Sequence, residues 1–207
     1  MNDAFLVRSP RLRGLPPVVS ASTRLLLLGS FPSAASLAAA QYYAHPRNQF
    51  WMILAALWGV DLRALPYRQR LAEVRRRGLG IWDVYASCRR DGSLDSAIEA
   101  AEPNDLASLV ARLPRLGAIA HNGGESARTM RLTRTLAPEV VRLPSSSPAN
   151  ASWSLARKVD AWREVFARHG LCDARPLPSR SLPPSHPGAP AQPGWATARR
   201  AKGARSA

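Results

Sequence analysis

The sequence predicts an α/β protein, a three-layer α/β/α sandwich with a mostly parallel central sheet of about four strands. Short apolar runs alternate with helical patterns along the chain, and this alternation is typical of parallel strands joined by crossover helices. The chain has 207 residues, of which 46% are hydrophobic, so it can bury the core of one such domain. We expect this domain to occupy residues 1–173 and to begin with an irregular lead-in over residues 1–23.

The expected strands are short apolar runs, and the expected helices place apolar residues three or four positions apart. The leucine run before Gly29 is the clearest strand, and Trp51, Leu54 and Trp58 mark the clearest helix. In chain order, we expect a strand over 25–29, helices over 48–58 and 67–77, a strand over 80–85, a helix over 103–113, a strand over 118–121, a helix from about 125 to 136, a strand over 140–143 and a helix from about 152 to 169.

The net charge of +15 is large for a chain of this size and predicts a polyanionic partner, with nucleic acid as the first candidate. Nearly all the positive charge is arginine, because Lys158 and Lys202 are the only lysines. The guanidinium fork matches phosphate groups and base edges better than an ammonium does. An anionic membrane is the second candidate, but the chain has no basic amphipathic helix separate from the fold, so we expect no membrane partner.

The composition changes at residue 174. Residues 174–207 contain seven prolines, six basic residues and no acidic residue, which predicts a disordered basic tail. Nine of the net positive charges remain in residues 1–173, so the folded part is basic in its own right. We expect the tail to add non-specific affinity for nucleic acid.

Cysteine usage excludes several classes of protein. With only Cys88 and Cys172, the chain cannot build a disulfide framework, a zinc ribbon or a four-cysteine iron–sulfur cluster by itself. We expect no metal site and no cofactor. The two thiols fit a reducing cytoplasm, and the N-terminus lacks the apolar core of a signal peptide. No run approaches the ~20 apolar residues of a membrane span, so we expect a cytoplasmic protein, associated with the nucleoid if the source is bacterial.

Three polar loops follow expected strands, over residues 29–48, 83–96 and 144–150. Parallel strands bring their carboxyl ends to one edge of a sheet, so these loops are expected to line one cleft. Each loop alone has a structural explanation, since Asn48 could cap the following helix and Asp83 could cap a turn. Their shared location in a basic chain favours a functional cleft.

Three segments resemble motifs of the uracil-DNA glycosylase superfamily, and the closest branch is the hypoxanthine-DNA (DNA-deoxyinosine) glycosylases. The resemblance covers about residues 22–170 and implies a monofunctional, monomeric enzyme. We expect no lyase activity, because the chain offers only Lys158, Lys202 and the α-amino group as amines for a Schiff base. Its substrate would be double-stranded DNA containing a deaminated base, from which it would release hypoxanthine by hydrolysing the N-glycosidic bond of deoxyinosine in base-excision repair. The segments are Gly29-Ser30-Phe31-Pro32-Ser33, Tyr43-Ala44-His45-Pro46-Arg47-Asn48-Gln49-Phe50-Trp51 and Leu143-Pro144-Ser145-Ser146-Ser147-Pro148-Ala149-Asn150.

The resemblance implies a division of roles in the site. Phe31 stands where mismatch-uracil relatives carry a water-positioning Asn, so in this branch Asn48 takes that role. Tyr43 is expected to stack on the flipped base. A carboxylate at Asp83 would accept the N1–H of hypoxanthine, whereas adenine presents an acceptor at N1. The other implied base-binding residues are Gly29, Ser30, Phe31 and Asn150.

The resemblance also implies residues that contact DNA. His45 and Arg47 are expected to contact phosphate. Leu143 replaces the His with which fast uracil enzymes support the leaving base, which implies slower turnover. His121 and Asn122 are expected to be structural. The remaining implied DNA-binding residues are Ser145, Ser146, Ser147, Pro148 and Ala149.

Three other functions are weighed against this one. Removal of uracil, alone or in mismatches, is the nearest, because uracil N3–H could satisfy the same acceptor at Asp83. A non-catalytic nucleic-acid-binding protein would show salt-sensitive binding without base release. A serine hydrolase is disfavoured, because Ser30 does not lie in a Gly-x-Ser-x-Gly elbow.

Overall fold

The computed structural model describes residues 10–174 of the chain. Residues 1–9 of the expected lead-in and residues 175–207 of the expected tail lie outside the described residues. Within the described part, no helix has the length and apolar character needed to cross a membrane.

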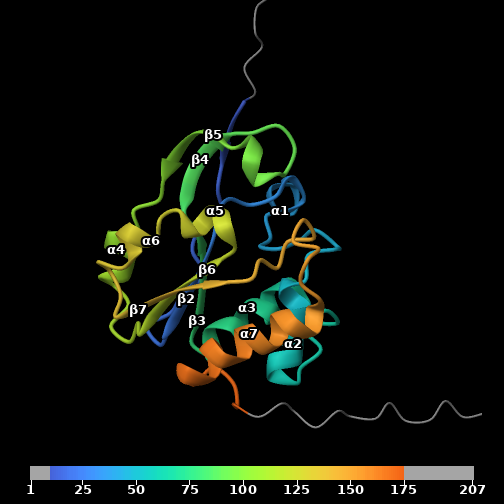
Figure 1. The fold of residues 1–207 in the computed structure, drawn as a ribbon, viewed down its shortest axis with the longest axis vertical. Coiled ribbons are helices and arrows are strands. Elements are labelled where there is room, and N and C mark those ends of the chain that lie inside the picture. Colours follow the sequence, from blue (N-terminus) through green and yellow to red (C-terminus); the bar gives the residue numbers. More distant parts are fainter. Residues whose placement is uncertain (1–9, 175–207) are drawn as a thin grey trace, which may run out of the picture. The chain divides into compact units, whose positions relative to one another are not determined.

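A four-stranded parallel sheet forms the centre of the fold, in the order β3-β2-β6-β7 (Figure 1). The strands are β2 (Leu25–Gly29), β3 (Leu79–Asp83), β6 (Ala118–Asn122) and β7 (Glu139–Leu143). Gly29 pairs with Asp83, and Asn122 pairs with Leu143, so the carboxyl ends of all four strands meet at one edge. The parallel sheet and its position in the sequence are confirmed.

The two faces of this sheet are covered by different helices, which confirms the three layers (Figure 1). Leu25 and Leu27 pack into a core with α2 (Phe50–Trp58) and α7 (Leu155–Arg168), and α3 (Tyr67–Arg76) joins them on this face. Leu26 and Leu28 point to the opposite face because side chains alternate along a strand. There they pack with α4 (Leu106–Val110), near the short helices α5 (Gly124–Ala127) and α6 (Met130–Thr133).

Several helices differ from the expected ones. The region from 125 to 136 is broken into α5 and α6 around Thr129, whose hydroxyl bonds the carbonyl of Ser126, a local bond that competes with continuous helix. The helix expected over 103–113 is the shorter α4, which Asp105 caps by accepting the N–H of Ser108. A further helix, α1 (Ala34–Ala39), lies in the segment expected to be a loop.

A second, antiparallel sheet is the largest departure from the expected fold. Its order is β1-β4-β5, with β1 (Arg11–Arg13), β4 (Tyr85–Arg89) and β5 (Glu99–Pro103), and it lies above the parallel sheet in Figure 1. The lead-in is therefore not wholly irregular, the strand expected over 80–85 ends at Asp83, and the loop expected over 83–96 contains β4.

Polar contacts hold much of this second sheet together, which explains why apolar periodicity did not reveal it. Arg11 pairs with Glu102 at 2.9 Å and donates to the hydroxyl of Ser87 at 2.7 Å. Ser87 in turn donates to Glu102 at 2.7 Å. The connection between β4 and β5, residues 90–98, contains a turn of 3-10 helix, η1 (Asp95–Ala97), and we call it the hairpin loop.

Candidate active site

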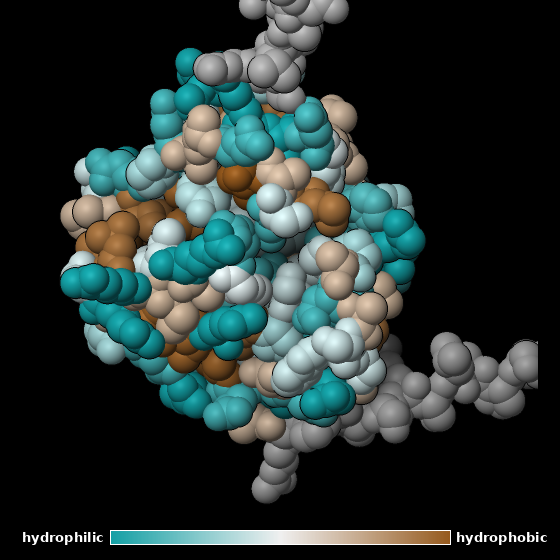
Figure 2. Space-filling model, turned by 45° about the horizontal axis from the view of Figure 1, so that its top comes forward, coloured by the Kyte–Doolittle hydropathy of each residue, from teal (hydrophilic) through white to brown (hydrophobic). Residues whose placement is uncertain are grey.

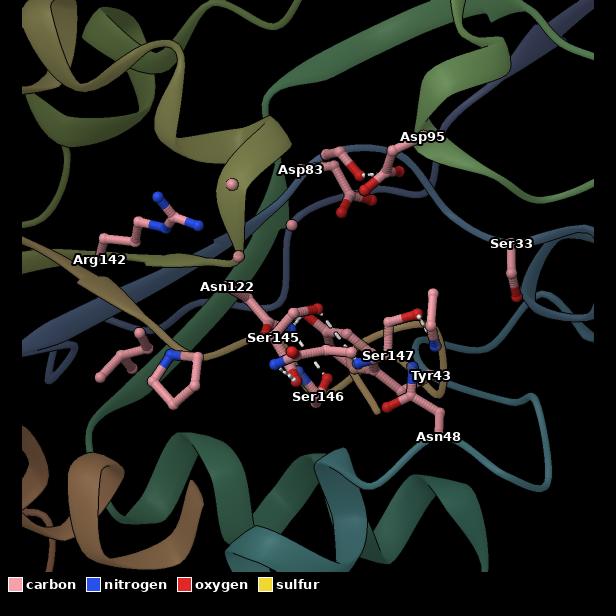
Figure 3. Close-up of a pocket in the computed structure, with 18 of the residues that line it drawn as sticks. Ser33, Tyr43, Asn48, Asp83, Asp95, Asn122, Arg142, Ser145, Ser146 and Ser147 are labelled. Atoms are coloured by element: carbon pink, nitrogen blue, oxygen red, sulfur yellow. Dashed lines mark hydrogen bonds between the residues drawn. The ribbon is translucent and has the colours of Figure 1, made fainter. Parts of the chain in front are cut away.

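The carboxyl edge of the parallel sheet opens into a cleft of about 870 Å³. The ends of the parallel strands, the loops that follow them and the hairpin loop between β4 and β5 line it (Figure 3). Most of the residues proposed from the sequence meet there, and they are Gly29, Ser30, Phe31, Tyr43, Asn48, Asp83, Ser145, Ser146, Ser147, Ala149 and Asn150. The lining does not include His45, Arg47 or Pro148. Lining residues that sequence reasoning missed include Ser93, Leu94, Asp95, Asn122, Arg142 and Trp153.

Asp83 is a buried carboxyl at the end of β3 and is 4% exposed. Its side chain packs directly on the Cα of Gly29, where any Cβ would overlap the Asp83 Oδ1 atom. Within residues 10–174, neither of its carboxyl oxygens accepts a hydrogen bond, and Oδ2 is fully buried. Burial, and secondarily the negative charge of Asp95, raise the pKa of Asp83 to about 7, and Arg90 opposes this shift.

Asp95 reaches the same end of the cleft from the hairpin loop, and Figure 3 shows the two aspartates close together. Its Oδ1 accepts a hydrogen bond of 2.6 Å from the hydroxyl of Ser30. The residue as a whole is exposed, but desolvation around its carboxyl raises the pKa of Asp95. Asp95 lies in the loop over residues 83–96 that was expected to line the cleft, but no motif in the sequence singled this residue out.

Both the ring and the hydroxyl of Tyr43 are fixed by contacts with other residues. Its ring stacks on Phe50 with centroids 3.9 Å apart, and its hydroxyl accepts a 3.2 Å hydrogen bond from Nδ2 of Asn122. Burial raises the pKa of Tyr43, so its hydroxyl is neutral at physiological pH. The backbone of Tyr43 has a φ of +56°, a left-handed conformation that is strained for a residue with a side chain.

Asn48 lies just before α2 and lines the cleft. Its Oδ1 accepts the backbone N–H of Phe50 at 3.0 Å, a local bond of the Asx-turn type. The N-cap residue of α2 is Gln49, so Asn48 is not the N-cap considered from the sequence, although it bonds the first N–H of the helix. This bond occupies one lone pair of Oδ1, and within the described residues it is the only hydrogen bond of the Asn48 side chain. The amide therefore bonds the start of the helix and, on the lining of the cleft, keeps further hydrogen-bonding capacity.

Asn122 links the two loops that flank the cleft, which is more than the structural role expected for it. Its Nδ2 donates to the hydroxyls of Tyr43 and Ser146, and its Oδ1 accepts the backbone N–H of Ser146 at 2.9 Å. Ser146 is completely buried, unlike Ser145 and Ser147 on either side. Its hydroxyl is therefore engaged inside the protein.

Lys158, on α7, connects the same two loops through hydrogen bonds. It projects from α7, is 1% exposed, and donates to Oε1 of Gln49 at 2.8 Å and to the carbonyl of Asn150 at 3.0 Å. Burial lowers the pKa of Lys158. Gln49 also donates its backbone N–H to the carbonyl of Ser146 at 2.9 Å. Gln49 is thus connected to the serine loop, residues 144–150, once directly and once through Lys158.

The predicted residues outside the cleft lining are exposed or make local hydrogen bonds within their own loop. His45 accepts the backbone N–H of Arg47 through Nδ1 at 3.2 Å, and the Arg47 side chain is exposed. Pro148 is exposed on the serine loop. His121 is fully buried and shares a 2.9 Å hydrogen bond with Thr133, and burial lowers its pKa to about 4, so it is neutral and structural, as expected.

The surface around this region is mostly hydrophilic, with a few hydrophobic patches (Figure 2). Among the described residues, no three His, Cys, Asp or Glu side chains are grouped to hold a metal ion. The polar groups of the cleft are instead carboxyls, amides and hydroxyls. Such groups read the hydrogen-bonding edge of a heterocyclic base, and the aromatic ring of Tyr43 offers a flat surface beside them.

The family model described as "Uracil DNA glycosylase superfamily" matches residues 16–166. A hypoxanthine DNA glycosylase from Methanosarcina barkeri is 36% identical over 156 residues, covering 75% of this chain and 98% of that protein. A hypoxanthine DNA glycosylase from Methanosarcina acetivorans is 38% identical over 157 residues, covering 76% and 98%.

A solved structure leads to the same family. The solution NMR structure of a protein assigned as a uracil DNA glycosylase from Methanosarcina acetivorans matches with a TM-score of 0.70 at 36% identity. The match covers 77% of this chain and 99% of that one. The family match spans both the strand ends and the loops that build the cleft. This chain belongs to the uracil DNA glycosylase superfamily.

Proposed function

We propose that this DNA glycosylase hydrolyses the N-glycosidic bond of deoxyinosine in double-stranded DNA and releases hypoxanthine, acting as a monomer. The observation that carries the proposal is the buried carboxyl of Asp83, which lines the cleft and accepts no hydrogen bond within the described residues. Two relatives named hypoxanthine DNA glycosylase support the same substrate.

Asp83 selects the base by its hydrogen-bonding pattern. Hypoxanthine carries a proton on N1, which the ionised carboxylate accepts. Adenine has a lone pair at N1, and against a carboxylate this would leave two acceptors facing each other in a buried site. With a pKa of about 7, Asp83 is partly ionised at neutral pH, so the N1–H of the correct base also stabilises the ionised form.

Tyr43 provides the surface on which the extruded base rests. One face of its ring is covered by Phe50, and its hydroxyl is fixed by Asn122, so the ring cannot turn away when a base enters. Stacking of a base on an aromatic ring contributes about 1–3 kcal/mol. Stacking cannot distinguish hypoxanthine from adenine, because both are purines of similar size, and this leaves the choice between those two bases to Asp83.

Asn48 positions the water that completes the reaction. As the bond between C1′ and N9 breaks, its electron pair leaves with the base and positive charge develops on the sugar. The oxygen of water then bonds to C1′ and gives up its proton, directly or through solvent, to the departing purine anion. An amide is a weak base, so Asn48 orients the water while the developing cation supplies the driving force.

The proposed enzyme has no lyase activity. A lyase of this kind needs an amine that can form a Schiff base with the sugar. Lys158 is buried and donates to Gln49 and Asn150, where it holds the loops together. Lys202 lies outside the described residues.

The serine loop and the segment before α2 are proposed to contact the DNA backbone. Ser145 and Ser147 are partly exposed on the lining of the cleft, and Pro148 and Ala149 are exposed beside them. Ser146 acts indirectly, because its hydroxyl is bonded to Asn122. His45 and Arg47 lie outside the lining, where they can meet phosphates that flank the extruded nucleotide.

Removal of uracil is the second candidate. The N3–H of uracil is a donor that Asp83 could accept in the same way, and the matching NMR structure is of a protein assigned as a uracil DNA glycosylase. Uracil is smaller than hypoxanthine and would cover less of the Tyr43 ring. We therefore place hypoxanthine first.

A panel of duplexes, each with one modified base, tests the proposal. The purified full chain is incubated with duplexes containing deoxyinosine, deoxyuridine or only normal bases, and the released base is identified by mass spectrometry. We expect free hypoxanthine and an intact abasic strand, with no product trapped by borohydride. Faster release of uracil than of hypoxanthine would establish the second candidate, and release of no base would refute both.

A further inference from the structure

Arg90 is a buried cation at the start of the hairpin loop, and no step of the proposed reaction uses it. The residue is 5% exposed. Its Nη2 donates to the carbonyl of Pro32, and its guanidinium carbon lies 5.2 Å from the centre of the Phe31 ring. Its Nε and Nη1 are buried and have no hydrogen-bond partner within residues 10–174. Burying a guanidinium with two unused donors is costly, so the presence of this charge needs a reason.

Asp83 carries the opposite charge, and it is buried to the same extent as Arg90. Each of the two side chains has buried polar atoms without a hydrogen-bond partner, and they form no direct ion pair, within the described part of the chain. In a buried region of low dielectric constant, opposite charges attract over longer distances than in water. The positive charge of Arg90 accordingly lowers the pKa of Asp83 and also that of Asp95, which the negative charge of Glu125 on α5 raises.

The other ionisable groups that face Asp83 cannot stabilise its negative charge. Asp95 faces it from the hairpin loop and is itself an acid. Tyr42 and Tyr43 face it from the segment before α2, and burial raises the pKa of both hydroxyls, so they are neutral at physiological pH. Among the described residues, the positive charge that acts on Asp83 is therefore that of Arg90.

Several bonds fix the hairpin loop, and with it Arg90, against the segment after β2. Ser93 accepts the first backbone N–H of α1 at 2.9 Å, and Asp95 accepts the hydroxyl of Ser30 at 2.6 Å. With the bond from Arg90, three contacts hold the loop against residues 30–34. Residues 30–33 line the cleft, whereas Arg90 is not part of the lining. The cation is therefore held behind the wall of the cleft, where it acts through other residues.

We propose that Arg90 is a positioning residue that serves as the counter-charge of Asp83, keeping this carboxylate ionised inside the protein and ready to accept the N–H of the extruded base. This inference rests on the proposed function for the identity of the base, but not for the electrostatic link between the two side chains. A carboxylate accepts a hydrogen bond more strongly than a protonated carboxyl does. Loss of the charge of Arg90 should therefore weaken base binding at neutral pH without any change in the residues that touch the base.

The test compares Arg90→Gln, which removes the charge but keeps a donor for the Pro32 carbonyl, with Arg90→Lys, which keeps the charge. The ionisation of Asp83 in the free protein is followed by NMR titration of carbon-13-labelled aspartate carboxyls, assigned with Asp83→Asn. We expect the midpoint, near pH 7 in the unmodified protein, to rise by about 1 pH unit in Arg90→Gln and by much less in Arg90→Lys. Arg89→Gln removes the neighbouring charge on β4 and should leave the midpoint in place.

Release of hypoxanthine as a function of pH provides the second readout. For a midpoint raised by 1 pH unit, kcat/KM at pH 7 should fall about 5-fold in Arg90→Gln and recover at higher pH. Arg90→Met replaces the buried charge with an apolar side chain and should show the same shift if Arg90→Gln does not fold. An unmoved midpoint in the uncharged variants, or an equal rise in Arg90→Lys, would overturn the proposal and leave Arg90 with the role of holding the turn. A midpoint that shifts as expected, without base release by the unmodified protein, would refute the proposed function alone.

Discussion

The two ends of the cleft differ in how their polar atoms are used. At one end, Asp83 has a buried carboxyl that accepts no hydrogen bond within the described residues. At the other end, Asn122 is bonded at both its nitrogen and its oxygen, to Tyr43 and Ser146. We call these the carboxyl end and the amide end. At the amide end, the nitrogen and the oxygen of Asn122 already have hydrogen-bond partners. At the carboxyl end, Asp83 has no donor among the described residues, and a ligand could supply one.

This difference assigns separate tasks to the two ends. A fully bonded network fixes geometry, which suits the placement of Asn48 and Tyr43 around the reacting sugar and base. An unpaired buried acceptor is costly until a matching N–H arrives, so it discriminates among bases. In our account, the amide end supports the chemistry and the carboxyl end chooses the base.

The largest effect is expected at Asn48. Asn48→Ala removes the group that we propose orients the water, and we expect kcat for hypoxanthine release to fall by about 100-fold or more. The measurement is single-turnover base release, with circular dichroism melting as the control for loss of the bond to the start of α2. If release persists at the unmodified rate, Asn48 only bonds the start of α2 and the amide end has another catalyst.

The pH dependence of the reaction tests the carboxyl end. Ionised Asp83 accepts N1–H much more strongly than the protonated carboxyl does. Because its pKa is raised to about 7, kcat/KM should rise with pH through about 7. Below that value it should fall about 10-fold per pH unit as the carboxylate is protonated.

Asp95→Asn provides the matched variant for this profile. It removes a negative charge that raises the pKa of Asp83, so the inflection of the pH profile should move to lower pH. The positive charge of Arg90, which lowers the pKa of Asp83, is unchanged in this variant. An inflection that stays in place would show that burial alone sets the ionisation of Asp83.

Lys158 tests whether the amide end depends on its connection to α7. Lys158→Met keeps the length of the side chain but removes the donor to Gln49 and Asn150. We expect a loss in kcat of about 10-fold with little change in the melting temperature, because a buried charge is replaced by an apolar group. A large loss of stability at unchanged kcat would mean that Lys158 serves the fold and not the loops.

The smallest effect is expected from the tail. Deletion of residues 174–207 removes six positive charges, so binding to DNA should weaken by several-fold at low salt and less at high salt. The preference among damaged bases should not change, because neither end of the cleft is altered. A filter-binding titration at two salt concentrations, combined with the panel of duplexes, measures both properties.

The amide end was more predictable from the sequence than the carboxyl end. Tyr43, Asn48 and the serine loop follow or precede elements with clear apolar periodicity, and the family resemblance covers them. Asp83 was found because it ends a buried strand. Asp95 lies in the loop over 83–96 that was expected at the cleft, but the residue itself was missed because the two strands that flank the hairpin loop are held by polar pairs such as Arg11–Glu102, which leave no apolar period to detect.

Asn122 shows a different limit. It ends an expected strand, but its importance lies in bonds to Tyr43 and Ser146, which are 79 and 24 residues away in the sequence. A single asparagine at the end of a strand could cap a helix, form a turn or hydrogen-bond two distant loops. Only the three-dimensional arrangement distinguishes these roles.

The most direct test of the two-ended account is the ratio of hypoxanthine to adenine release by Asp83→Asn, measured in single turnover against the unmodified enzyme. An amide can donate as well as accept, so it should bind either purine edge. We predict that the ratio falls by about 10-fold or more, with less hypoxanthine released and adenine released in detectable amounts. An unchanged ratio at an unchanged rate would contradict the claim that the carboxyl end chooses the base.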